Sequence, residues 1–506
     1  MEHKSSFNVL VVMYVCLGSV MYGYGASIIG TTLGQPTFIK YMKLDTASNA
    51  VQLEGAINGL FQVGGLFGTF GSQYFSDRFG RLKALFVACC FYLLGGVLQT
   101  GSAAVGMFIV ARFITGVGVV PQYQSEISSP HSRGLLVGFH GGALGIGYCM
   151  ASWIGVGFFH VHAQNTQWRI PLAIQCILPI ILGAGVLFLP ESPRWLVQRH
   201  QKDRALEVLK RLHHDPSDPD DSFALAEFTQ IDRQLEEERH LETGWSSFWK
   251  VPANRKRAAM GFWIMFGLQC TGTQVINNYG TLLYSNLGYG SSTQLLLQAG
   301  WITQAVIGNF SNAFYMDKFK RIHLFVFGLV MDGIVLIIEM ILLSLYSHST
   351  NRAGNQAAVA MLFLHGAFYA FSLDGTSYVY MTEIFPTHLR SKGISISIAG
   401  LYIAPLILLT SAPTAFAHIG WKYYIVFVVC IVLTLVFIIL VCPETRGMPL
   451  EEIAALFGDK VVAHIDETGH VQVEHDEKNA AVALQTGEPD EIEHSREVSG
   501  KETMIA

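Results

Sequence analysis

The densest group of chemically useful side chains lies in residues 269–278, which read QCTGTQVINN. At about 100° per residue, Gln269, Thr273, Gln274, Asn277 and Asn278 share one half of a helix. Amides donate and accept hydrogen bonds without net charge, so they suit a neutral ligand rich in hydroxyl groups. The alternative is that these amides bond neighbouring helices together. Two Gln and two Asn in ten residues exceed what such packing needs, so the pattern favours a ligand-facing surface.

Asp374 is the acid whose position most strongly indicates a function. It precedes Glu383 by nine residues, so a helix places it about 13 Å deeper in its apolar run. A carboxyl at that depth is costly, and we expect it to bind substrate hydroxyls or a proton. Asp332 and Glu339 lie deep in another run and are predicted to be packing groups with internal partners. His140 is either a solute contact or a packed histidine.

The chain that carries these residues is too apolar for a soluble protein. Its 506 residues are 51% hydrophobic and 14% charged, with a mean hydropathy of +0.37, whereas soluble proteins carry about 25% charged residues. The net charge of −5 and the lack of a basic stripe argue against nucleic-acid binding. The eight Cys fall in apolar runs without paired spacings, so we expect no disulfide framework, no metal and no cofactor. The composition indicates a membrane protein.

Twelve apolar runs are long enough to cross a bilayer, which takes roughly 20 residues per helix. They lie near 7–30, 55–76, 84–101, 107–121, 134–159 and 170–189, then near 258–285, 293–316, 322–346, 357–380, 393–416 and 421–442. Short segments on the N-terminal side of the membrane carry eleven Lys and Arg, against five on the other side. The positive-inside rule therefore places both termini in the cytoplasm.

The runs divide the chain into five parts. A cytoplasmic N-terminus (1–6), a first six-helix bundle (7–189), an intracellular helical linker (190–257), a second six-helix bundle (258–442) and an acidic cytoplasmic tail (443–506) follow one another. The tail is expected to be mostly disordered after residue 457 because it is strongly acidic. The predicted fold is an all-α membrane protein of twelve transmembrane helices with short intracellular helices.

The two halves repeat a pattern of charges. DRFGR at 77–81 follows the second span, and DKFKR at 317–321 follows the eighth. Glu126 and Arg133 follow the fourth span with the same interval as Glu383 and Arg390 after the tenth. Parallel repeats of six spans are typical of carriers whose halves rock about a central site. Acids and arginines at helix ends on one face could form a latch that weights one conformation against another, although ordinary interfacial charge is the simpler alternative.

Several motifs resemble those of a known family. PESPRWL at 190–196, EIFP at 383–386 and PETRG at 443–447, together with the repeated charge clusters, resemble the sugar porter family of the major facilitator superfamily, in its fungal type. The resemblance extends to about Ile453. It implies two six-helix bundles, alternating access, and a path lined by helices 1, 4, 7 and 10. The predicted latch comprises Asp77, Arg81, Glu126, Arg133, Glu191, Arg194, Asp317, Arg321, Glu383, Arg390, Glu444 and Arg446.

The resemblance also implies where the solute binds. The family normally carries a Gln-Gln pair where this chain has Leu268-Gln269, and aromatic residues near Tyr378 and Tyr402. Both tyrosines could equally be interface or packing residues. The predicted solute-binding residues are Gln269, Thr273, Gln274, Asn277, Asn278, Tyr378, Asp374, Tyr402 and His140.

Four features depart from the family. Proton-coupled relatives carry an Asp where this chain has Gly25, and a sugar-binding Gln where it has Gly141. The third departure is at Leu268, where the amide of the family's Gln-Gln pair is lost. In the fourth span, Arg112 and Glu126 are separated by only about 21 Å of helix, against about 30 Å of hydrocarbon, so the span is unusually short. The helix unwinds, the bilayer thins, or residues are missing.

These observations predict a secondary transporter, not an enzyme, for a small neutral polyhydroxylated solute such as a hexose, a related sugar or a polyol. Two alternatives stay open: a carrier of another oxygenated metabolite, such as a quinate-like acid or a secreted product, and a non-transporting sugar sensor that signals through its tail. The expected partners are the solute and the lipid bilayer, with proton coupling undecided and no nucleic acid. We expect a monomer that spans the plasma membrane many times.

Overall fold

The computed structural model describes residues 6–118, 133–161, 165–212, 221–238, 244–346, 349, 351–386, 388–446, 453, 456–458, 463–465 and 471–473. The chain forms two compact units, Met1–Arg446 and Gly447–Ala506. The first unit contains the helices that could cross a membrane, and the second belongs to the tail.

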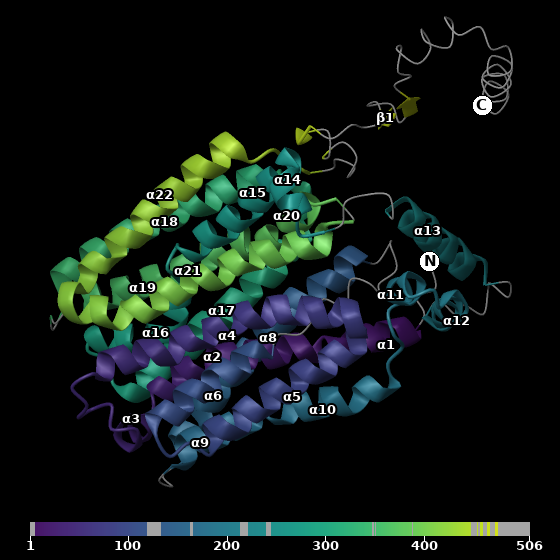
Figure 1. The fold of residues 1–506 in the computed structure, drawn as a ribbon. Helices are drawn as coiled ribbons and strands as arrows, with labels where there is room; N and C mark the ends of the chain where they lie inside the picture. Colours follow the sequence, from purple (N-terminus) through teal and green to yellow (C-terminus); the bar gives the residue numbers. More distant parts are fainter. Residues whose placement is uncertain are drawn as a thin grey trace, which may run out of the picture. The chain divides into compact units, whose positions relative to one another are not determined.

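The first half of the larger unit supplies one group of long helices (Figure 1). They are α1 (Ser6–Val15) with α2 (Leu17–Leu33), α4 (Ala50–Phe79), α5 (Arg81–Thr100), α6 (Val105–Val117), α8 (Arg133–Phe159), and α9 (Thr166–Ile174) with α10 (Ile177–Gly185) and the 3₁₀ turn η1 (Val186–Phe188). The short helix α3 (Pro36–Tyr41) follows α2. Within this bundle α2 packs along α8, and α6 lies between α4 and α5.

The second half supplies the other group. It consists of α15 (Pro252–Gln269) with α16 (Thr273–Asn286), α17 (Ser291–Tyr315) with η2 (Met316–Lys318), α18 (Arg321–Tyr346), α19 (Arg352–Phe368) with the π-helical segment η3 (Tyr369–Asp374) and α20 (Gly375–Glu383), α21 (Arg390–Ile419) with η4 (Gly420–Tyr423), and α22 (Tyr424–Val441). Here α15 packs along α21, and α18 lies between α19 and α22.

These elements match the twelve predicted runs in order. Seven segments among the described residues are, by length and composition, apolar enough to span a bilayer, and the longest of them, Arg390–Val441, covers both α21 and α22. The remaining runs fall on α6, which is apolar but has only 13 residues, and on α4, α15 with α16, and α17, which carry more glycine and polar residues. The predicted helical membrane fold is confirmed, and the order of the helices is consistent with twelve spans.

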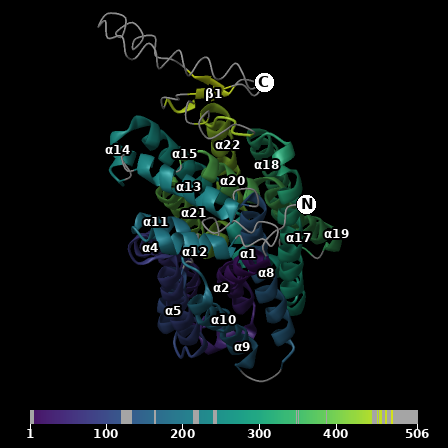
Figure 2. The same ribbon diagram turned by 90° about the vertical axis from the view of Figure 1, so that its right-hand side faces the viewer.

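The linker forms the short helices expected there, α11 (Pro193–Gln198), α12 (Lys202–Leu212), α13 (Ser222–Glu238) and the one-turn α14 (Ser247–Lys250). Figure 2 shows α11, α12 and α13 gathered at one end of the helices. Leu196, Val197, Ala205 and Leu235 bury a small core between them. The Trp195 indole donates to the Asp77 carbonyl at 3.1 Å, so this layer is fastened to the end of α4.

Three pairs of helices join the halves: α4 with α21, α8 with α17, and α2 with α16. Glycines allow the close approach between α4 and α21. A Cβ added at Gly55 would lie 2.5 Å from the Thr410 carbonyl oxygen, so a larger residue there would separate the two backbones. The bundles therefore meet through small residues along this seam.

The described part of the fourth span is a short helix. Helix α6 has 13 residues and ends at Val117, so it is about 20 Å long. Its end lies against Gly68 of α4, whereas α4 continues to Phe79. The predicted latch residue Glu126 lies outside the described residues.

The smaller unit contains a two-stranded antiparallel hairpin, β1 (Ala463–Ile465) with β2 (Val471–Val473). Ala463 faces Val473, His464 faces Gln472 and Ile465 faces Val471. The hairpin lies in the part of the tail for which the acidic composition predicted no ordered structure.

Candidate solute site

The seventh span is broken at its centre. Helix α15 ends at Gln269 and α16 begins at Thr273, and Gly272 between them has a φ of +88°, which glycine adopts without strain. The break changes the direction of the helix within the polar stretch. The single polar face expected from the sequence is therefore divided.

Two amides of this stretch face the tenth and fifth spans. The Gln269 amide donates to the Tyr369 hydroxyl at 3.1 Å, and its own oxygen has no partner. Gln274 is half-buried, and its side chain lies beside the hydroxyl of Tyr148. Both amides thus lie beside tyrosines from other helices.

The other three predicted residues of this stretch point elsewhere. The Thr273 hydroxyl lies 3.1 Å from His365 Nε2, inside the second bundle. The Asn278 amide donates to the backbone carbonyl of Gln274 at 2.9 Å. Asn277 is buried, and its backbone oxygen would lie 3.0 Å from a Cβ at Gly30, so this part of α16 packs against α2.

Asp374 closes the π-helical segment of the tenth span. A π turn widens a helix by one residue and is frequent at functional sites. The Asn309 amide of α17 donates to Asp374 Oδ2 at 2.7 Å. Asp374 remains half-buried, so its carboxyl has one fixed donor and one oxygen available to a solute.

Five tyrosines that lie near this carboxyl or near one another form a group that we call the tyrosine cage: Tyr22, Tyr148, Tyr369, Tyr378 and Tyr402. They come from α2, α8, η3, α20 and α21, and so from both bundles. Tyr148, Tyr369 and Tyr378 lie close enough to Asp374 to interact with its charge. Tyr22 and Tyr402 lie close enough to interact with each other across the seam between the bundles. The cage therefore joins the halves around one acid.

Arg112 of α6 is a buried cation near the cage residue Tyr22, and it is 1% exposed. Its guanidinium donates to the Gly25 carbonyl at 2.7 Å and stacks on the Phe61 ring at 4.2 Å. A Cβ at Gly25 would overlap the Tyr92 hydroxyl, so the packing leaves no room for an acid at Gly25.

The two sides of the cage differ in closure. On the side of Leu33, the Tyr279 hydroxyl of α16 donates to the Leu409 carbonyl of α21 at 2.9 Å and approaches the Glu54 carbonyl of α4 at 3.3 Å. On the side of the linker, Gly141 of α8 is exposed, and an added Cβ would meet no atom within 4 Å. Gly141 lies two helical turns from Tyr148 on the same face. Among the described residues, α16, α21 and α4 are in contact on the side of Leu33, and Gly141 is exposed on the side of the linker.

The repeated charges form the same structure in each bundle. Glu191 accepts backbone hydrogen bonds from Arg81 at 2.9 Å and Leu82 at 3.3 Å, and Glu444 accepts them from Arg321 at 2.9 Å and Ile322 at 3.1 Å. Each glutamate thus caps the first turn of the helix after its repeat, where the helix dipole favours an anion. Burial raises the pKa of the Glu191 carboxyl, and the backbone donors oppose that rise.

Ion pairs accompany these caps. Arg81 lies 3.5 Å from Asp77, and Arg321 lies 3.2 Å from Glu383, whose other oxygen accepts from the Thr445 hydroxyl at 2.6 Å. Each of these pairs joins helices of one bundle. The side chains of Arg133, Asp317 and His140 lie outside what the structure describes, whereas Arg194, Arg390 and Arg446 are described and make contacts.

A contact between the bundles on this side comes from the linker instead. The rings of Phe70, Trp245, Phe248 and Phe385 follow one another with centroids 5.9, 6.3 and 6.4 Å apart. Phe70 belongs to α4 and Phe385 follows α20, so the chain of rings connects the two halves. The Gln73 amide also donates to the Ser391 hydroxyl at 3.2 Å.

The structure places three residues in the site that the sequence did not single out, namely Tyr22, Tyr148 and Tyr369. Tyrosine in an apolar span reads as packing or as an interface residue, so each lacked a signal of its own. A helical wheel of α8 would have put Tyr148 on the face of Gly141, which the resemblance had already marked. The shared face of Tyr148 and Gly141 was therefore the signal in the sequence that pointed to Tyr148.

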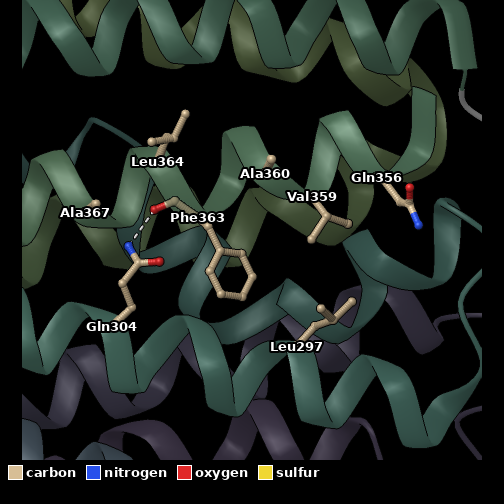
Figure 3. Close-up of a pocket in the computed structure, with 8 residues that line it drawn as sticks. All are labelled: Leu297, Gln304, Gln356, Val359, Ala360, Phe363, Leu364 and Ala367. Atoms are coloured by element: carbon tan, nitrogen blue, oxygen red, sulfur yellow. Dashed lines mark hydrogen bonds between the residues drawn. The ribbon is translucent and has the colours of Figure 1, made fainter. Parts of the chain in front are cut away.

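A separate groove lies between α17 and α19, away from the cage. Figure 3 shows its lining, with the Gln304 amide donating to the Phe363 carbonyl at 2.7 Å. The lining is mostly apolar and comprises Leu297, Gln304, Gln356, Val359, Ala360, Phe363, Leu364 and Ala367. Among the described residues, no cluster of three His, Cys, Asp or Glu could hold a metal.

Comparisons with known proteins agree with this architecture. Residues 11–457 match the sequence profile described as sugar (and other) transporter. The chain is 32% identical over 456 residues to the MFS-type transporter criB of Aspergillus cristatus, covering 88% of this chain and 93% of the relative. It is 29% identical to a quinate permease of Emericella nidulans, covering 88% and 87%, and 27% identical to the MFS glucose transporter mfs1 of Aspergillus flavus, covering 90% of each.

Among solved structures, the proton:xylose symporter XylE bound to 6-bromo-6-deoxy-D-glucose has the same fold. The two superpose with a TM-score of 0.75 at 22% identity, covering 90% of this chain and all of the other. A partially occluded inward-open form of XylE from E. coli gives 0.74 at 21% identity, with coverage of 88% and 100%. The chain is thus a multi-pass membrane protein of the transporter type, and it belongs to the sugar porter family of the major facilitator superfamily.

Proposed function

We propose that this chain carries a small neutral polyhydroxylated solute, a hexose, related sugar or polyol, through the tyrosine cage. The observation that carries the proposal is the chemistry of the cage: five tyrosines and the amides of Gln269 and Gln274 around one carboxyl, from both bundles. Tyrosine offers a hydroxyl for hydrogen bonds and a ring face for the apolar C–H face of a sugar. These groups recognise a molecule that alternates hydroxyls with carbon–hydrogen faces.

The charge of the cage supports a neutral solute over an acid. Asp374 faces the cage, while the Arg112 guanidinium is held by backbone carbonyls behind Phe61. A carboxylate solute would have to approach the Asp374 carboxyl without an opposing cation, and burying unpaired charge costs several kcal/mol. Hydroxyl groups would instead donate to the acid.

The proposed movement of the two bundles is inferred from the contacts on the two sides of the cage. The arrangement has contacts between α16, α21 and α4 on the side of Leu33, and open space at Gly141 on the other. If the bundles rock about the cage, the first contacts break while the linker side closes. The carrier works either as a facilitator or as a proton symporter. We further propose that both termini lie in the cytoplasm, that the home membrane is the plasma membrane and that the chain works as a monomer.

The second candidate is a carrier of an oxygenated acid, because several relatives are named quinate permeases. A panel in proteoliposomes that contain the full chain separates the two. We expect saturable exchange of D-glucose, D-xylose or myo-inositol and no exchange of quinate. Saturable quinate flux with silence of all three neutral solutes would establish the second candidate and reject the first.

Replacing Gln274 by Ala is expected to lower the uptake of the neutral solute about three- to tenfold at normal surface expression. One hydrogen bond to a neutral ligand contributes about 0.5–1.5 kcal/mol, which corresponds to that range. Gln304→Ala is the matched control, since it removes an amide from the groove on α17. Initial rates should fall in the first variant alone, and wild-type kinetics in Gln274→Ala would remove this residue from the site.

Removing residues 457–506 is expected to leave solute uptake unchanged. The cage and both bundles belong to the unit that ends at Arg446, so the tail supplies none of their residues. The measurement is the uptake rate per molecule at the surface, compared with the full chain. Normal transport by the truncated protein would exclude the alternative that the chain is a non-transporting sensor that signals through its tail.

A further inference from the structure

The second bundle buries ionisable groups that the solute site does not use. Asp332, Glu339 and His365 are each 0% exposed. The sequence contains no Lys or Arg between residues 322 and 351 or between 353 and 389, so His365 is the available cation beside these carboxyls. Burying an unpaired charge in an apolar core of this kind costs free energy.

Asp332 and His365 face each other. Asp332 Oδ1 lies 3.3 Å from His365 Nδ1, while His365 Nε2 lies 3.1 Å from the Thr273 hydroxyl, which contacts the Thr271 hydroxyl at 3.0 Å. The contact between the acid and the imidazole is close but is not aligned as a hydrogen bond. Both Asp332 oxygens and His365 Nδ1 are therefore buried without a hydrogen-bond partner. Such unsatisfied polar atoms mark a place for a proton or a water molecule.

The pair also lies where two helices are interrupted. Thr273 begins α16 directly after the break at Gly272, and His365 lies four residues before the π-helical segment that ends at Asp374. Tyr369 of that segment lies close enough to interact with both Asp332 and Asp374. A change of charge at the pair therefore acts on the segments that hold the amides and the carboxyl of the cage.

We propose that Asp332 and His365 form a proton-binding site that couples the access state of the carrier to pH. With one proton, shared as imidazolium and carboxylate or as two neutral groups, the pair has no net charge and fits a dry core. Loss of that proton to water leaves a net charge of −1, which requires hydration. The proton-bound pair therefore stabilises the arrangement described here, which is closed on the side of Leu33. The site itself does not depend on which solute is carried, whereas its use in proton-coupled transport rests on the proposed function.

Other titratable groups near the pair could also give a pH dependence, and their effects have to be distinguished from that of the pair. Tyr369 faces it from η3, the segment that ends at Asp374, and Glu339 lies two turns away on α18 beside Tyr284 and Tyr424. Among the described residues of the packed helices, these are the groups that could add a pH dependence. Asp332→Asn, Glu339→Gln and Asp374→Asn distinguish their contributions.

The test uses a cysteine at Gly141 in the full chain, labelled by a maleimide from the linker side without any solute. Labelling of the parent chain gives the background. Between pH 8 and 5.5 we expect labelling of the Gly141→Cys chain to rise as pH falls, by up to about tenfold per pH unit for one proton. Asp332→Asn should make labelling high and independent of pH. His365→Gln should move the rise to lower pH, and Glu339→Gln should retain the original profile.

Three results would overturn the proposal: labelling of the Gly141→Cys chain that does not change with pH, a wild-type profile in Asp332→Asn, or a profile abolished by Asp374→Asn instead. The first needs no further variant to fold. Because no solute is present, a silent solute panel would reject the proposed function while leaving this site standing.

Discussion

Replacing Asp374 by Asn is expected to reduce solute uptake about 10- to 100-fold while the protein still reaches the membrane. Hydrogen bonds to a charged group contribute about 1.5–3 kcal/mol each, and the carboxyl has an oxygen that Asn309 does not occupy. Asn keeps the size of the side chain but loses the second strong acceptor. The measurement is the initial uptake rate of the active neutral solute at matched surface amounts.

Glu339→Gln is the control for this effect, because it removes another buried carboxyl of the same bundle outside the cage. It should transport at a rate close to that of the unmodified chain. If Asp374→Asn also transported normally, the acid would be a packing residue, and the cage would bind its solute without a carboxyl.

Replacing Gly55 by Leu is expected to abolish most transport, at least tenfold, by wedging α4 away from α21. A Cβ at Gly55 would lie 2.5 Å from the Thr410 backbone oxygen, and a backbone cannot move aside as a flexible side chain can. The contacts of Tyr279 with Leu409 and Glu54 would then fail to close. A maleimide applied from the side of Leu33 should reach a cysteine in the cage more readily in this variant.

The same substitution at Gly71 tests whether the effect comes from the seam. Gly71 lies on α4, but an added Cβ there would meet no atom within 4 Å. Gly71→Leu should therefore fold and transport as the unmodified chain does. Equal losses in both variants would indicate a general effect of leucine on α4, and the seam would not be the moving contact.

The sequence predicted the helices well because each span must satisfy its own backbone in lipid, which makes length and hydropathy sufficient signals. It also predicted the repeat, and the structure shows that Glu191 and Glu444 perform the same capping role in the two halves. That repetition follows from local contacts between each glutamate and the next helix. Local contacts of this kind can be predicted from the spacing of residues in the sequence.

The proposed solute site was predicted less completely, because its members come from five spans whose rotations depend on packing between bundles. Tyr148 of the first bundle lies near Asp374 of the second, and Tyr22 lies near Tyr402, which no period within one helix could indicate. Thr273 was assigned to the polar face of a continuous helix, yet the break at Gly272 turns it toward His365. A single glycine with a positive φ therefore changed which side chains share a face.

Alternating access at the cage is tested most directly by placing a cysteine at Tyr148. The measurement is its reaction with a membrane-impermeant maleimide applied from each side. Tyr148 lies in the cage and is half-buried, so a rocking carrier must expose it to both compartments in turn. We expect reaction from either side, slowed by the transported solute, and stopped from the linker side by Gly55→Leu. Reaction from one side only, in every variant and with every solute, would contradict alternating access at this site.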